Sequence, residues 1–476
     1  MAIEFTISLE ISQWWHRWMQ NHPHLPSHLP RLVLADRFQP TYVKHCEVTQ
    51  QLLPLLRQVD WEQLPTTLTW RCAGERTVPL AAYIGAYLVK LERNLPTFGA
   101  LHRFLREHPA LIWSLGFPLV GKSNSVAGFA PDASLPSHNH FARKLSMIPN
   151  EILQALLDGQ VATLKAHLGQ EFGQVIAIDT KHILAWVKEN NPKAYPDKDE
   201  HGQPVERNKQ QPAGDKDCKL GCKRRRNQVT PTKEGRPLAA KGTIGEYYWG
   251  YASGVVVTKV ADLGEFVLAE CTQTFDLTDI SYFFPLMEQV EARLGFRPPF
   301  ATADAAFDAF YIYDYFHQPE GNGFAAIPLR QMKHGIRQFD EDGLPLCEAG
   351  LAMPLKNSYT NRTSMVQHKR GRYVCPLLYP EATGASCPID HEQWPIGGCL
   401  LTIPTSPGAR IRYQLNRQSD AYQDVYRQRT AVERIFSQAV NLGIERPKLR
   451  NQAAITNINT LTYLLINLRL RQRLGL

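Results

Sequence analysis

The sequence predicts an α/β fold in which a mostly helical N-terminal region precedes a sheet-containing core. From about residue 172 onward, short apolar runs typical of strands alternate with segments of helical periodicity. The preceding segments instead repeat apolar residues at helical spacing. A third stretch is rich in Gly and Pro and has no long amphipathic helix, which favours a strand-rich insertion. We therefore divide the chain into residues 1–170, 171–330, 331–415 and 416–476, the last closing the core with helices.

Composition indicates a folded protein of two or three domains. The chain has 476 residues, of which 43% are hydrophobic and 10% aromatic. No apolar run approaches the roughly 18 residues that a membrane span needs. Residues 2–36 lack a secretory pattern, and nine scattered cysteines argue against a disulfide framework. We expect a cytoplasmic, nucleoid-associated protein without a membrane partner.

The positive charge is unevenly placed. The formal net charge is +8, yet segments 188–241 and 410–476 each carry a clear excess of Lys and Arg, so the remainder is acidic. Such asymmetry fits a polyanion such as DNA. Solvated surface loops are the alternative interpretation.

Helical periodicity defines the N-terminal region. We expect helices over 78–91, 97–107, 109–115 and 137–168, the last with a break at Pro149. Short helices joined by short turns suit a helix-turn-helix reader that binds DNA or mediates dimerisation. They suit a plain scaffold equally well.

The core shows the order strand, strand, strand, helix, strand, helix, strand. Val175–Ile178 is a short apolar run that Asp179 ends, and a similar run over 300–303 is followed by Asp304. The other expected elements are strands over 247–258, 265–275 and 324–329, and helices over 280–294, 308–317 and 452–474, the last a basic closing helix.

Three acidic residues form the candidate catalytic and metal site. Asp179 and Asp304 follow strands, where active sites of α/β sheets are usually built. Glu433 lies on a predicted single helix together with Tyr426 and Arg429. Tyr426, Arg429 and Glu433 stand at positions i, i+3 and i+7 and so share one face of that helix. Carboxylates held by a sheet suit two Mg²⁺ or Mn²⁺ ions, which activate a water or a 3′-hydroxyl for attack on a phosphodiester.

These residues resemble the prokaryotic DDE insertion-sequence transposases of the cut-and-paste group, which have a ribonuclease H-like core. The segment from Ile176 to Lys181 is similar to the first-aspartate strand, and that from Ala303 to Asp308 to the second. Tyr426, Arg429 and Glu433 resemble three letters of the Y-R-E-K signature, and Pro136–Phe141 with Arg143 is similar to the N-terminal domain. The resemblance covers the chain from about residue 75 onward, including an insertion before the glutamate.

The signature lysine is missing, because position 440 is Val440. Either Lys448 or Arg446 replaces it, or this phosphate contact is absent. Asp308 is a second acidic residue near Asp304, and we expect it to cap the helix that it starts.

The resemblance implies metal-dependent cleavage at transposon ends followed by strand transfer. Asp179, Asp304 and Glu433 would hold the metal ions, while Tyr426 and Arg429 would contact phosphates of the inverted repeats. The partners would be double-stranded transposon and target DNA and a second copy of the chain. A nuclease that cuts without joining and a catalytically silent DNA-binding protein on the same fold are the alternatives.

Two weaker signals remain. The run Lys223, Arg224, Arg225 and Arg226 is expected in a loop between the first two strands, as a DNA-phosphate contact or as a solvated turn. Four cysteines of the insertion either bind a structural Zn²⁺, with His391 nearby, or are reduced structural residues: Cys347, Cys375, Cys387 and Cys399.

Overall fold

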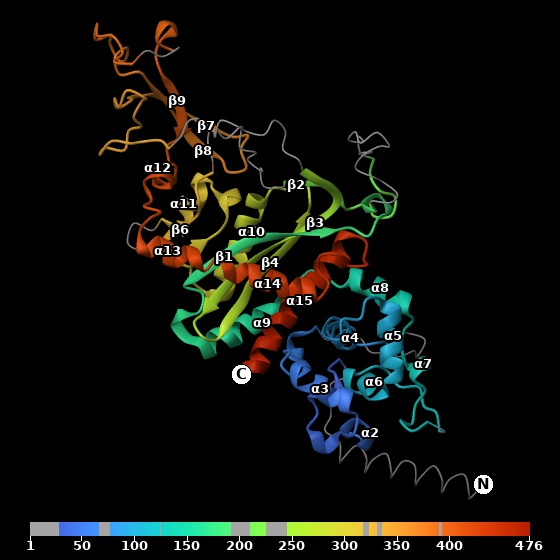
Figure 1. The fold of residues 1–476 in the computed structure, drawn as a ribbon. Helices are drawn as coiled ribbons and strands as arrows, with labels where there is room; N and C mark the ends of the chain where they lie inside the picture. Colours follow the sequence, from blue (N-terminus) through green and yellow to red (C-terminus); the bar gives the residue numbers. More distant parts are fainter. Residues whose placement is uncertain are drawn as a thin grey trace, which may run out of the picture.

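The computed structural model describes a mixed α/β chain with one large and one small sheet. It describes residues 28–65, 77–123, 125–191, 210–224, 245–317, 323–330, 336–389 and 393–476. The N-terminal helices and the small sheet lie at opposite ends of the molecule, with the large sheet between them (Figure 1). Within the described ranges, every helix is too short or too polar to cross a bilayer.

The N-terminal region is helical, as predicted. Two of its helices start at caps that the sequence encodes: Thr97 accepts a hydrogen bond from the Ala100 amide at the start of α5, and Ser137 accepts one from the His140 amide at the start of α8. Its helices are α2 (Thr41–Lys44), α3 (Glu47–Leu56), α4 (Leu80–Glu92), α5 (Phe98–Glu107), α6 (Pro109–Leu115), α7 (Pro131–Ser134), α8 (His138–Met147) and α9 (Asn150–Leu168).

Six strands form the large sheet. The central path runs β2-β3-β1-β5-β6, and β4 pairs with β3 as well. β1 is antiparallel to β3 but parallel to β5, which is in turn parallel to β6. The strands are β1 (Val175–Leu184), β2 (Lys219–Arg224), β3 (Gly245–Val260), β4 (Gly264–Thr274), β5 (Phe300–Thr302) and β6 (Phe324–Ala326).

Alternation along the strands creates two cores, one on each face of the sheet. Ala177 and Ile183 of β1 belong to a core shared with α14 (Thr430–Asn441), α15 (Gln452–Leu474) and the N-terminal helices. Ile176 and Ile178 face the other core, with α9, α10 (Phe283–Leu294) and α11 (Phe310–Phe316). The face of the sheet on which a polar side chain of β1 lies therefore determines which helices can contact it.

The closing helix α15 forms where predicted and is mostly buried. Its cations are confined to its last turns, while the preceding turns are almost fully buried. The buried Asn467 amide donates to the Val267 carbonyl and accepts from the Val267 amide, both at 2.9 Å. These bonds satisfy the backbone of β4 beside its irregular pairing with β3. The helix thereby ties the sheet to the N-terminal helices.

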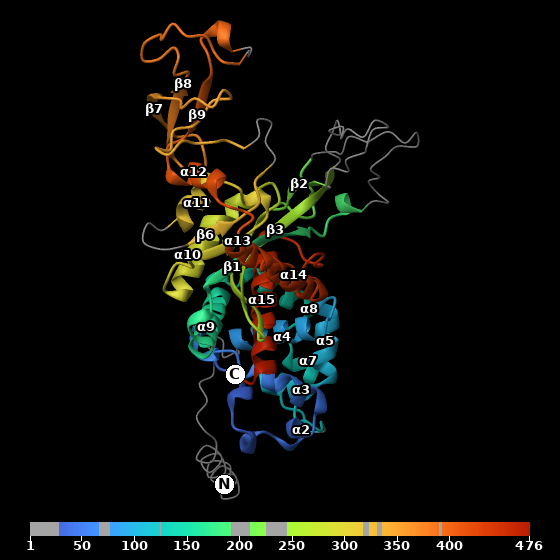
Figure 2. The ribbon, with the colours of Figure 1, turned by 60° about the vertical axis from the view of Figure 1, so that its left-hand side comes forward.

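The predicted strand-rich stretch contains the small sheet. It consists of β7 (Leu355–Asn361), β8 (His368–Val374) and β9 (Leu400–Pro404), which are antiparallel neighbours in that order. Figure 2 shows this sheet projecting from the rest of the chain. The short helix α12 (Pro407–Gln414) follows and packs on α11, and α13 (Asp420–Arg427) then returns the chain to the large sheet beside β5 and β6.

Candidate carboxylate site

Asp179 lies in the middle of β1, not at its end as predicted. The strand continues to Leu184 because β3 supplies pairing partners for the whole segment, from Asp179 opposite Val255 to Leu184 opposite Gly250. Asp179 shares its face with Ala177 and Ile183, so its side chain is on the side of the sheet that α14 covers. One of its carboxylate oxygens accepts from the Thr180 amide at 2.8 Å.

Asp304 lies beside Asp179 because the parallel register of β1 and β5 aligns them. Ala177 pairs with Thr302, and each aspartate follows two residues later. Neighbouring strands are about 4.8 Å apart, which brings two carboxylates close together. Asp304 also caps a short 3₁₀ turn by accepting from the Ala306 amide at 2.8 Å.

Burial disfavours the charged forms of both aspartates, and nearby carboxylates add to this effect. Burial raises the pKa of Asp179 to about 7, with a further rise from the charge of Asp304, while Arg429 opposes the shift. The pKa of Asp304 is also raised, chiefly by burial and then by Asp279. Two partly desolvated acids of this kind favour a cation between them.

Arg429 stands between the two acidic segments. Its Nη1 lies 2.6 Å from a carboxylate oxygen of Glu433, and its Nη2 lies 3.9 Å from one of Asp179. The pKa of Arg429 is raised by these two carboxylates despite the opposing effect of burial. Its Nε is buried and has no hydrogen-bond partner. The guanidinium is therefore only partly satisfied where it lies.

The predicted single helix through Tyr426 and Glu433 is wrong. α13 ends at Arg427, and α14 starts anew at Thr430. The Thr430 hydroxyl donates to the Arg427 carbonyl at 3.1 Å, and such a local bond competes with regular helical bonding. The turn between the helices carries Arg429 towards β1.

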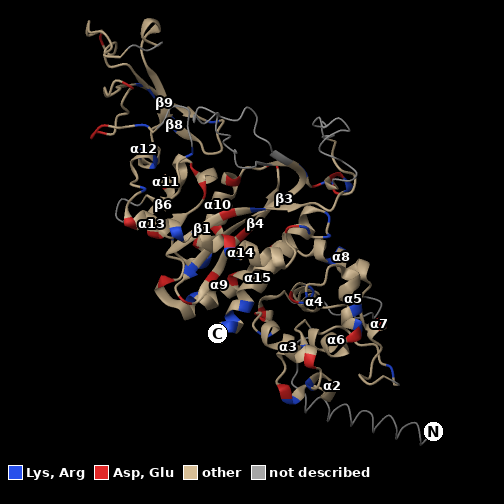
Figure 3. Cartoon of the chain, viewed as in Figure 1, with Lys and Arg blue, Asp and Glu red and all other residues tan. Residues whose placement is uncertain are grey.

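Glu433 is not assembled with the two aspartates into a three-ligand group. Its side chain is 52% exposed and is paired with Arg429. In the part of the chain that the structure describes, no group of three or more His, Cys, Asp or Glu residues is arranged to hold a metal ion. Acidic and basic residues are interspersed around β1 and α14 (Figure 3). The geometry thus joins Asp179 with Asp304, and reaches Glu433 only through Arg429.

The ring of Tyr426 packs at the edge of the core. It stacks on Tyr422 with 5.9 Å between ring centroids and packs against the small buried cluster of Ala326, Tyr422 and Val425. Tyr426 also lies close enough for its charge state to affect Arg429. Its predicted phosphate contact would have to come from the hydroxyl, since the ring has a packing role.

Asp279 is an acidic neighbour that the sequence analysis missed. It begins a short 3₁₀ turn (Asp279–Tyr282) before α10 and accepts a 2.5 Å hydrogen bond from the Thr180 hydroxyl. Its charge raises the pKa values of both Asp179 and Asp304. Asp279 does not follow a predicted strand, and its position just before a predicted helix is typical of a helix cap. Its proximity to the two aspartates is therefore visible only in the folded structure.

Asp308 does not cap a helix, contrary to our expectation. α11 begins at Phe310 without a side-chain cap. The Asp308 carboxylate is fully buried and instead forms a two-pronged ion pair with Arg412, with oxygen–nitrogen contacts of 2.5 and 2.6 Å. It also accepts from the Tyr313 hydroxyl and the Arg330 amide. Asp308 therefore anchors α12 to α11.

The residues proposed to replace the signature lysine lie beyond the end of α14. Val440 itself packs against the core. The Lys448 ammonium lies 5.7 Å from the ring of Trp186, just after β1, and Arg446 lines a cavity. Neither cation occupies the place of Val440.

The basic run begins in a strand, not in a loop. Lys223 and Arg224 end β2, where they pair in register with Glu246 and Gly245 of β3. Arg225 and Arg226 lie outside the described residues. The run remains a predicted DNA contact.

Cys347 and Cys375 are neighbours of Cys399, although among the described residues no three such side chains are arranged to hold a metal ion. Burial and the neighbouring thiols of Cys375 and Cys347 raise the pKa of Cys399 to about 12. Cys387 is not among those neighbours, and all four thiols are free of disulfides. His391 lies outside the described residues. The zinc hypothesis and that of reduced structural cysteines both stay open.

Comparison with known proteins gives no identification. A scan against protein-family models finds none that matches the chain, and a search of curated proteins finds no significant match.

Proposed function

We propose that the chain is a metal-dependent DNA transposase that cleaves transposon ends and joins them to target DNA. The observation that carries this proposal is the juxtaposition of Asp179 on β1 with Asp304 just after the neighbouring parallel strand β5, with the pKa of each raised. The element order supports a ribonuclease H-like core with β2 as an additional strand: four antiparallel strands, a helix, a strand, a helix and a strand. The residue pattern described above adds the transposase assignment.

The aspartate pair fits a divalent cation. Each carboxylate has lost much of its hydration, and the two repel one another, so a cation would restore their charged forms. Mg²⁺ and Mn²⁺ prefer such oxygen ligands. When bound, two ions would activate a water or a 3′-hydroxyl and stabilise the leaving oxygen. Asp179 and Asp304 would be their first ligands.

Glu433 would join the aspartates only after Arg429 releases it. The 2.6 Å pair between them occupies one oxygen of the Glu433 carboxylate. A DNA phosphate offers Arg429 a bidentate partner, and its unpaired Nε offers a further donor. In this proposal DNA binding moves the guanidinium from carboxylates to phosphate. Because this pairing holds Glu433 apart from the aspartates, a catalytically silent DNA-binding protein is the second candidate function.

Supercoiled plasmid assays test the proposal. We expect Mg²⁺-dependent nicking and joined products from the wild-type protein, and at least about 100-fold less of both from Asp304→Asn. Asp262→Asn is the matched control, because Asp262 lies in an exposed turn at φ 60°, which Asn tolerates. Cleavage without joining would identify a nuclease. Equal activity of Asp304→Asn and wild type would reject the aspartate site.

A further inference from the structure

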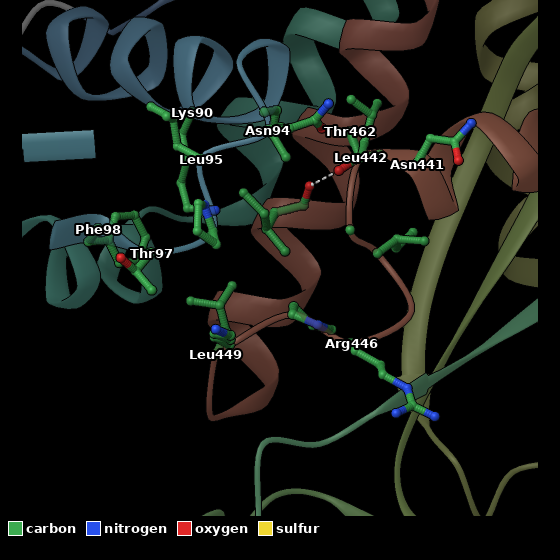
Figure 4. A pocket seen from close by; sticks show the side chains of 17 residues that line it. Lys90, Asn94, Leu95, Thr97, Phe98, Asn441, Leu442, Arg446, Leu449 and Thr462 are labelled. Atoms are coloured by element: carbon green, nitrogen blue, oxygen red, sulfur yellow. Dashed lines mark hydrogen bonds between the residues drawn. The ribbon is translucent and has the colours of Figure 1, made fainter. Parts of the chain in front are cut away.

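A cavity of about 270 Å³ lies between the N-terminal helices and the turn that connects α14 to α15. Lys90 from α4 and Thr97 and Phe98 at the start of α5 form one wall. Asn441 at the end of α14 and Arg446 from the turn that follows form the other (Figure 4). This cavity is separate from the carboxylate site, and nothing in the proposed reaction uses it.

The charged residues that line this cavity are all cationic. They are Lys90, Arg446 and Lys448, and neither Asp nor Glu is present in the lining. Two cations close by do have carboxylate partners: Arg469 pairs with Glu92 at 2.7 Å and Lys181 with Glu445 at 3.6 Å. Among the described residues, none of the three cavity cations forms an ion pair, and Lys90 is the one that is partly buried, since Arg446 and Lys448 are exposed to solvent.

Lys90 is the cation with the least compensation. Burial lowers its pKa to about 8, and no charged neighbour opposes that shift. Among the described residues it makes no ion pair or hydrogen bond; its ammonium lies 5.7 Å from the ring of Phe98. Arg446 likewise has no ion pair or hydrogen bond in the described part of the chain, and its side chain extends along the far wall away from Lys90 (Figure 4). An anion would satisfy groups that the fold leaves unpaired.

The start of α5 adds positive potential to the same wall. This helix has ten residues, and its first turn contributes Phe98 to the lining just after the cap residue Thr97. Unpaired amides and the helix dipole favour anions at such an end. Asn94, Asn441 and Thr462 supply neutral polar groups. The volume lies below the roughly 300–1,000 Å³ of sites for drug-sized ligands, which favours one compact anionic group.

We propose that this cavity binds a single phosphate group. The group is either a free phosphate ion or one phosphate of a nucleic-acid backbone. A tetrahedral phosphate presents several acceptor oxygens, and these match the Lys90 ammonium and the start of α5. The proposal does not depend on the transposase assignment, since it needs neither a divalent cation nor the carboxylates.

Two binding measurements in EDTA test this proposal on the full chain. The first follows thermal unfolding in inorganic phosphate against chloride at equal ionic strength. The second measures binding to a random-sequence duplex at several salt concentrations, where each lost phosphate contact lowers the slope of log K against log salt by about 0.9. The variant is Lys90→Met, which removes the charge and keeps an apolar stem. Lys122→Met is the matched control, because Lys122 is exposed elsewhere.

Each outcome decides the matter. Phosphate-specific stabilisation that Lys90→Met abolishes and Lys122→Met keeps identifies a free-ion site. A backbone phosphate is identified if free phosphate has no effect and if, in Lys90→Met alone, the slope of log K against log salt falls by about 0.9, the amount expected for one lost phosphate contact. If Lys90→Met folds poorly, Lys448→Gln takes its place in both assays. A variant that matches Lys122→Met in both measurements would overturn the proposal. A negative result in these two measurements would not bear on Mg²⁺-dependent cleavage, so the phosphate proposal and the transposase proposal can fail independently.

Discussion

Replacing Asp179 with Asn should stabilise the protein in the absence of metal. The pKa of Asp179 rises from its ordinary value of 3.8 to about 7 in the folded chain. Each pKa unit corresponds to about 1.4 kcal/mol, so the charged carboxylate costs the fold about 4 kcal/mol at neutral pH. The side chain keeps 19% of its exposure, and solvent screening should reduce the measured gain to about 2–4 kcal/mol.

The gain should depend on pH with a definite sign. Because the folded-state pKa is raised, the folded protein binds more protons between pH 3.8 and about 7, and its stability falls as pH rises through this window. Asp179→Asn lacks this loss. The difference between variant and wild type should be small below pH 4, grow up to about pH 7 and then stay constant.

Denaturant unfolding in EDTA at pH 4, 5.5, 7 and 8 measures this difference. Asp262→Asn serves as control, since it alters an exposed turn and should track the wild type throughout. An Asp179→Asn protein that is no more stable at pH 8, or whose advantage is the same at every pH, would refute the reasoning. Stability gained by removing a charged site residue is typical of functional carboxylates.

Two further predictions concern buried charge. Arg429→Gln removes the cation that pairs with Glu433 and Asp179. We therefore expect calorimetry without DNA to show that Mn²⁺ binds this variant about tenfold more tightly than the wild type. Unchanged or weaker binding would contradict this prediction. Arg412→Met leaves the fully buried Asp308 carboxylate without its charged partner. Thermal unfolding should then show that the free energy of unfolding falls by about 3–5 kcal/mol. A fall of less than about 1 kcal/mol would contradict the anchoring role of this pair.

Local sequence signals were sufficient for most of the helices and strands. Thr97 and Ser137 cap helices whose apolar spacing is regular, and Pro149 separates α8 from α9 where predicted. The strand ending before Asp304 was also correctly placed. In each case neighbouring residues carry the information, because caps, prolines and periodicity act within a few positions.

The remaining differences arise from contacts between distant segments. β1 extends past Asp179 because β3 pairs with all of it. Asp279 meets the aspartates through Thr180, 99 positions earlier in the chain. The ion pair of Asp308 with Arg412 joins residues 104 positions apart. Neither periodicity nor motif spacing encodes such distances.

Iron-mediated backbone cleavage tests most directly whether Asp179 and Asp304 hold a divalent cation. Fe²⁺ replaces Mg²⁺ in the purified chain, and ascorbate with peroxide then generates radicals at the bound ion, so that mass spectrometry can locate the cuts. We predict cuts near residues 179 and 304 that excess Mg²⁺ suppresses and Asp304→Asn abolishes. Cuts elsewhere only, or an unchanged pattern in Asp304→Asn, would contradict the account.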